Sequence, residues 1–227
     1  MDFIVRPART AAAAAGALIA VLVLIGPLQA ADSGGAVDAA PARAGDVGAV
    51  DAVVATAQAA RADRVRRLAL NDPLFEGERL ETGADARLHA TMRDGSVLML
   101  GADAALTLDR FVLDQGVAGA EMRVLRGAFR LISGEINKGL GGGLTIRTPL
   151  ATIGVRGTDF WGLQREDSLL MALIDDGELS ITLPSGTVVL SDPMTLMRFQ
   201  RGEALPTLET LTPEGLTQAA ETVALPE

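Results

Sequence analysis

The stretch Thr145-Ile-Arg-Thr-Pro-Leu-Ala-Thr-Ile-Gly-Val-Arg-Gly-Thr-Asp-Phe160 decides the fold of this chain. Its apolar and polar residues alternate, which is typical of strands with one buried face. Pro149 and the two glycines Gly154 and Gly157 interrupt this alternation. The stretch therefore predicts two strand pieces joined through a tight corner, with Arg156 held near the bend.

The rest of the chain carries the same kind of pattern. Short apolar or alternating runs, separated by Gly, Pro, Asn and Asp, recur along the sequence from residue 72 onward. Gly48 to Ala60 also suggests a strand, although its many alanines leave a helix open. We therefore expect an all-β fold, a compact β roll or sandwich of many short, mostly antiparallel strands. The runs are 86–92, 97–100, 106–112, 121–132, 168–174, 178–183 and 187–190.

Two glycines allow the local backbone geometry to be predicted. Asp94-Gly95 fits a two-residue type I′ turn, which would pair Met92 with Val97 across a hairpin. The returning strand is apolar on both faces, so we expect it to lie centrally and to be covered on both sides. Gly127, in the middle of its run, predicts a bend or a close packing contact.

The two ends of the chain differ from the middle. Residues 1–30 have Arg6 and Arg9 ahead of an uncharged apolar run of about fifteen residues, which is the pattern of a secretory signal peptide. A membrane span needs about twenty residues, so an uncleaved anchor is the alternative. Residues 31–46 predict a flexible linker, since they are rich in Ala, Gly, Asp and Pro.

These boundaries leave a β domain over residues 47–200 and a tail over 201–227. The tail contains Thr212 followed by Pro213, which predicts an N-cap and the first position of a short C-terminal helix. No second apolar run approaches spanning length, so no membrane span is expected after signal cleavage.

Composition excludes several classes of function. The net charge is −9 and would be −10 after cleavage at Ala30, so nucleic acid is not expected as a partner. There is no cysteine and only one histidine, which removes disulfides, most transition-metal sites and any Cys- or His-based nucleophile pair. We expect no cofactor and no enzymatic activity.

Five residues near the corner form the candidate recognition or structural site. Arg147, Arg156 and Asp159 supply its charges, and Gly157 supplies the conformational freedom of the bend. Arg156 is expected either to latch the corner by pairing with Asp159 or strand-end carbonyls, or to form an exposed recognition site. Trp161, the only tryptophan, is either a core residue or an anchor at an interface.

Other chemistry-bearing residues have simpler interpretations. The glycines of 139–143 lack the Lys and Ser or Thr that a phosphate loop needs after them, so a flexible hairpin is expected. His89 lies on the polar face of its strand and is expected to be solvated. Asp175-Asp176-Gly177 lacks the spacing of a calcium loop and is expected to form a hairpin turn.

From about Asp72 to Leu183, the chain resembles the FecR domain family. The resemblance rests on several sequence blocks in the expected order. The strongest runs from Arg147 to Phe160. The blocks are Gly77–Gly83, Met92–Leu98, Leu125–Arg130 with Ser133-Gly134, Arg147–Phe160 and Asp176–Leu179.

This resemblance implies an exported module for binding or signalling. The best-known members are cytoplasmic-membrane sensors with a cytoplasmic anti-sigma segment and this domain in the periplasm. Only five residues precede Arg6 here, which departs from that layout. We therefore expect a periplasmic or secreted, non-enzymatic protein that engages another envelope protein or senses a ligand. The oligomeric state is left open. The alternatives are a glycan-binding or structural envelope protein, a membrane-anchored sensor if residues 1–30 are retained, and a hydrolase that uses paired carboxylates.

Overall fold

The computed structural model describes residues 45–114, 117–137 and 143–226. The predicted signal peptide, most of the predicted linker and most of the glycine run at 139–143 lie outside these residues. The last predicted linker residue, Asp46, begins the first strand. Within the described part of the chain, no helix is both long and apolar enough to cross a membrane.

Within the part of the chain that the structure describes, nine strands form the first sheet, which we call sheet A. The backbone pairings fix the order β4-β1-β6-β7-β9-β12-β13-β16-β17, and all of them are antiparallel. In that order the strands are β4 (Pro73–Phe75), β1 (Asp46–Val54), β6 (Arg87–Met92), β7 (Val97–Leu100), β9 (Val117–Ile132), β12 (Asp159–Gln164), β13 (Ser168–Leu173), β16 (Thr195–Gln200) and β17 (Thr207–Thr210).

The second sheet, sheet B, packs against the first. Its order is β3-β2-β5-β8-β9-β10-β11-β14-β15, and β10 runs parallel to β9 while the other pairings are antiparallel. The strands not yet given are β3 (Arg64–Arg67), β2 (Ala57–Arg61), β5 (Arg79–Thr82), β8 (Ala105–Asp114), β10 (Leu144–Arg147), β11 (Thr152–Arg156), β14 (Glu178–Leu183) and β15 (Gly186–Leu190).

Strand β9 belongs to both sheets because it turns a corner at Gly127. Its first part pairs with β8 and β10 in sheet B, and its last part pairs with β7 and β12 in sheet A. Gly127 has φ +93°, and a Cβ there would lie 2.6 Å from the Cβ of Ala104. The predicted close packing at Gly127 is therefore confirmed, and glycine is needed for both reasons.

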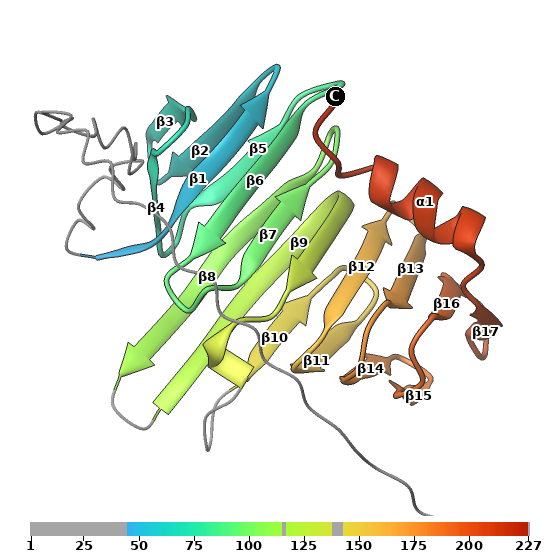
Figure 1. Cartoon of the computed structure of the whole chain (residues 1–227). Helices are drawn as coiled ribbons and strands as arrows, with labels where there is room; N and C mark the ends of the chain where they lie inside the picture. The colour runs from blue at the N-terminus through green and yellow to red at the C-terminus, as the bar shows by residue number, and fades with distance from the viewer. Residues whose placement is uncertain (1–44, 115–116, 138–142, 227) are drawn as a thin grey trace, which may run out of the picture. The chain divides into compact units, whose positions relative to one another are not determined.

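Successive segments of the chain cross repeatedly from one sheet to the other. Figure 1 shows these segments in chain order, from β1 and β2 in blue to β16 in orange. Gly127 pairs with Gln164 at one end of β12, whereas Gly157 precedes Asp159 at the other end. The crossings at Ala55, Asp85, Asp103 and Gly127 thus lie at one end of sheet A, and those at Gly157, Gly177 and Met194 lie at the opposite end. All seven of these crossing residues have positive φ, and so do Asn71 and Gly77 at the two crossings beside β4.

The main core fills the space between the two sheets. Alternate residues of the strands point into it, among them Phe129 and Phe160, whose rings meet edge to face with centroids 6.4 Å apart. A third layer lies on the outer face of sheet A, where α1 (Pro213–Glu221) packs beside β12, β13 and β16 (Figure 1). A short 3₁₀ helix, Glu135–Asn137, follows β9.

Several predictions are confirmed and others are wrong. The all-β architecture is confirmed, and Gly48–Ala60 forms β1 and β2, not the alternative helix. The helix start is also confirmed, because Thr212 Oγ1 accepts from the N–H of Gly215 at 3.1 Å. By contrast, Asp175-Asp176-Gly177 links β13 in sheet A to β14 in sheet B and is not a hairpin turn.

The predicted type I′ turn is wrong by one residue. Thr91, not Met92, pairs with Val97. The loop consists of residues 93–95, and Gly95 is the member with positive φ, at +79°. Three-residue hairpin loops of this kind place a glycine in the left-handed region at their last position. The central position of β7 between β6 and β9 is confirmed.

Candidate functional site

The corner between β11 and β12 is fixed by hydrogen bonds to two neighbouring strand ends. Gly157 has φ +52°, so the predicted left-handed bend is present. The N–H of Thr158 donates to Ser133 Oγ at 2.8 Å, and Ser133 Oγ donates back to the Thr158 carbonyl at 2.6 Å. Thr158 Oγ1 donates to the carbonyl of Asp175 at 3.0 Å. This corner therefore ties the ends of β9 and β13 to the start of β12.

The hairpin loop at 93–95 lies at the same end of sheet A and has its own buried network. The Asp94 carboxylate is buried and accepts from Ser96 Oγ at 2.6 Å and from the N–H of Ile136 at 3.2 Å. The N–H of Gly134 donates to Ser96 Oγ at 2.8 Å. A buried carboxylate with several donors is well compensated. These bonds give the Asp-Gly-Ser and Ser-Gly blocks a structural role.

Asp159 takes a different partner from the predicted one. Its carboxylate accepts two hydrogen bonds from Arg130, at 2.9 Å from Nε and 2.6 Å from Nη2. Only 22% of the Arg130 side chain and 16% of the Asp159 side chain are exposed. The hydrogen bond to Asp159 raises the pKa of Arg130 above its ordinary value, although burial opposes this. The predicted pairing of Arg156 with Asp159 is wrong.

Trp161 lies in the core beneath α1. Its side chain is buried, in the cluster that α1 forms on the outer face of sheet A. Its indole N–H donates to Thr222 Oγ1 at 2.9 Å, which satisfies the polar edge of the ring. Of the two roles proposed for this residue, the structure places it in the core within the chain.

Arg147 and Arg156 lie on the opposite side of the sandwich, on the outer face of sheet B. Val155 points into the main core, so its neighbour Arg156 points outward. Arg147 pairs with Glu121 at 3.3 Å, and Arg156 pairs with Glu178 at 3.5 Å. The Arg156 side chain is 82% exposed. Both charges are therefore available to a partner.

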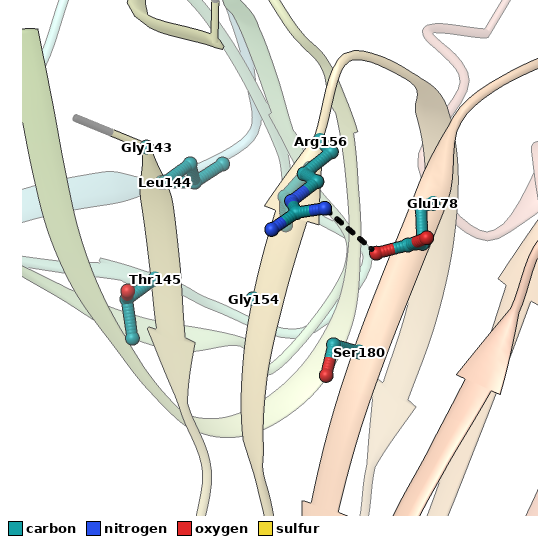
Figure 2. Close-up of a pocket in the computed structure, with 8 residues that line it drawn as sticks. Gly143, Leu144, Thr145, Gly154, Arg156, Glu178 and Ser180 are labelled. Atoms are coloured by element: carbon teal, nitrogen blue, oxygen red, sulfur yellow. Dashed lines mark ion pairs between the residues drawn. The ribbon is translucent and has the colours of Figure 1, made fainter. Parts of the chain in front are cut away.

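A shallow hollow lies beside Arg156 on this face. Three residues in register, Thr145, Gly154 and Ser180, run across β10, β11 and β14. Because Gly154 has no side chain, the surface is depressed there, with a volume of about 280 Å³. Figure 2 shows the hollow with Arg156 and Glu178 joined over its edge.

The five predicted residues therefore do not form one site. Asp159 and Trp161 face outward from sheet A, and Arg147 and Arg156 face outward from sheet B, with Gly157 between them at the crossing. Residue-by-residue reading missed Arg130 and Glu178, which are the actual partners of the two central charges. The exposed alternative for Arg156 agrees with its outward direction in β11, but only the strand order identifies Glu178 as its partner.

His89 also differs from the prediction. Instead of being solvated, its Nε2 lies 2.7 Å from the carbonyl oxygen of Val223, just after α1. This contact helps to hold the C-terminal segment on sheet A. Among the described residues, no group of three or more His, Cys, Asp or Glu side chains is placed to hold a metal ion.

The family described as "FecR protein" matches residues 78–189, about half of the chain. This chain carries a FecR domain. The matched part begins in the β4–β5 turn and ends in β15. It includes the crossings at Gly127 and Gly157 and all of the residues that line the hollow on sheet B. FecR proteins are regulatory and are typically periplasmic.

Solved structures and curated sequences add little to the FecR assignment. Two crystal structures, at 1.65 and 2.50 Å resolution, of a candidate anti-sigma factor from Parabacteroides distasonis ATCC 8503 are similar at 16% identity and a TM-score of 0.49. Each alignment covers 61% of this chain and 62% of that chain, so the similarity spans less than two thirds of either protein. No curated protein sequence matches the chain.

Proposed function

We propose that this chain is an exported, non-enzymatic FecR-type signalling module that binds another envelope protein through the outer face of sheet B. The observation that carries the proposal is the exposed Arg156 beside the hollow at Gly154. The family match supports a regulatory role, and the leader-like residues 1–30 support export.

The two outer faces of the sandwich are not equivalent. On sheet A, α1 covers Trp161 and its neighbours, so much of that face is occupied from within the chain. On sheet B, Thr152 and Thr182 are exposed and Ser180 is half-exposed. This polar, open face matches the rim chemistry of a non-obligate interface better than the covered face does.

Arg156 is the side chain best suited to anchor such a partner. Its pair with Glu178 is long and largely solvated, so it contributes little stability and competes weakly with an incoming carboxylate. A guanidinium binds carboxylates through two parallel hydrogen bonds, and arginine is enriched among the residues that dominate binding energy. An acidic group of the partner would then lie over Arg156, while a small side chain or a backbone segment enters the hollow.

The same surface does not favour the hydrolase alternative. Glycoside hydrolysis needs two facing carboxyl groups. The hollow on sheet B is lined by one, that of Glu178, and this group is already paired with Arg156. The regulatory character of the FecR family points in the same direction.

The test is recovery of a specific partner from the cell envelope of the source organism. Full-length chain would be used as bait beside Arg156→Glu and a matched control, Arg201→Glu. Arg201 is also exposed and paired, with Asp167, but it lies at the end of β16 in sheet A. We expect a partner that the wild type and Arg201→Glu recover equally and that Arg156→Glu loses. Recovery of no specific partner, or equal recovery by all three, would contradict the proposal.

Export is tested separately by intact mass. A mature protein that begins at Ala31 is expected. A mass that retains residues 1–30 would instead support the membrane-anchored sensor.

A further inference from the structure

A second hollow lies on the other side of the sandwich, between α1 and the outer face of sheet A. We call it the helix groove, and its volume is about 200 Å³. Most of the side chains that line it are apolar. The lining residues are Trp161, Leu163, Leu170, Leu196, Arg198, Leu211, Gly215, Gln218, Ala219 and Thr222.

The groove exists because α1 covers only one of two parallel rows of side chains. The first row, Trp161, Ala172 and Leu196, runs in register across β12, β13 and β16 and is buried under the helix. The next row along the strands begins with Leu163 and Leu170, which are half-exposed beside the helix.

Three residues of α1 line the groove: Gly215, Gln218 and Ala219. Ala219 is the buried residue of α1, and Gly215 also lines the groove. Gly215 has no side chain and Ala219 has only a methyl group, so these two positions leave space beside the helix. Apolar surface in such a concave site is in contact with water, so its burial by an apolar ligand is favourable.

The second row ends with a positively charged side chain, that of Arg198. Arg198 is directly opposite Leu170 in the strand register, so the row reads Leu163, Leu170, Arg198. The Arg198 guanidinium pairs with Glu209 at 3.2 Å, and about half of each side chain is exposed. An exposed pair of this kind is weak and can exchange for another carboxylate.

We propose that the helix groove binds a small amphipathic anion, with an apolar body over Leu163 and Leu170 and a carboxylate on Arg198. The volume limits the apolar body to about one ring or a short branched chain. The binding chemistry requires both parts, because the floor of the groove is apolar and Arg198 at its end can exchange the Glu209 carboxylate for that of the ligand. This site lies on sheet A, so it is independent of the protein-binding face proposed on sheet B.

Trp161 lines the groove and is the only tryptophan of the chain, which provides a direct readout. The full-length mature protein would be titrated with phenylacetate while Trp161 fluorescence and Tm are followed. We expect a saturable change in fluorescence, a dissociation constant on the order of 1 mM, as is usual for so small a ligand, and a rise in Tm. Phenylacetamide, the neutral analogue of similar shape, is expected to bind about tenfold more weakly or worse.

Arg198→Gln is expected to remove this preference, with phenylacetate weakened about tenfold and phenylacetamide unchanged. Arg201→Gln is the matched control, because Arg201 is equally exposed and lies outside the groove. It is expected to leave both titrations as in the wild type. The proposal is overturned by the lack of a saturable response to phenylacetate, by equal binding of the two probes, or by an unchanged phenylacetate affinity in Arg198→Gln.

Discussion

Replacing Gly127 by alanine tests whether the corner of β9 holds the two sheets together. Two costs are expected. The backbone has φ +93°, which costs a residue with a Cβ about 1–2 kcal/mol. The new Cβ would also collide with Ala104, and overpacking of this kind costs about 1–3 kcal/mol more. We therefore expect Gly127→Ala to lower the free energy of unfolding by about 2–5 kcal/mol.

Gly202 offers a control that separates these two costs. Its φ is +91°, nearly that of Gly127, but a Cβ there would have no other atom within 4 Å. Gly202→Ala should therefore cost only the backbone term, about 1–2 kcal/mol.

Urea unfolding followed by circular dichroism gives both free energies of unfolding, provided that the slope of each transition is unchanged. In a domain of this size, each kcal/mol corresponds to roughly 2–4 °C in Tm. If the free energies of unfolding of the two variants agree within about 0.5 kcal/mol, Ala104 moves aside without a measurable cost, and the close packing assigned to the corner is wrong.

Two further substitutions, at Asp159 and Gly157, test the start of β12. Asp159→Asn leaves Arg130 without its half-buried anionic partner and is expected to cost about 2 kcal/mol in thermal or urea unfolding. The matched change Asp167→Asn, in the exposed pair with Arg201, is expected to cost less than about 0.5 kcal/mol, and equal costs would refute the distinction. Gly157→Val places a β-branched residue at φ +52° in open space, so a backbone cost of about 1–2 kcal/mol is expected without a clash. An unchanged Tm for this variant would show that the corner relaxes.

The sequence predicts the elements of this fold better than it predicts their partners. The alternation of apolar residues identifies most of the strands, although not β3, β16 or β17. Thr212 with Pro213 identifies the start of α1, and both signals are local. The loop at 93–95 is mispredicted because Asp94 is held by Ile136, forty-two residues away. A local rule for Asp-Gly turns does not include such a contact.

The candidate site shows the same limit. Arg156 and Asp159 are three positions apart, and Asp159 is one of the partners expected for Arg156 from the sequence. The crossing at Gly157 moves the chain from sheet B to sheet A between them, so their side chains point to opposite exteriors. Their actual partners, Glu178 and Arg130, are set by strand order, which a single sequence does not reveal.

The double membership of β9 has a consequence for assembly of the chain. A nascent polypeptide emerges from its N-terminus, so β1 to β9 are available before β10 and β12 exist. At that stage β9 is an edge strand twice, once in each sheet, with the future positions of β10 and β12 empty. Unpaired edges are where aggregation and strand exchange begin. The chain is therefore most prone to aggregation and strand exchange after residue 132, the end of β9, has been made and before residue 164, the end of β12, has been made.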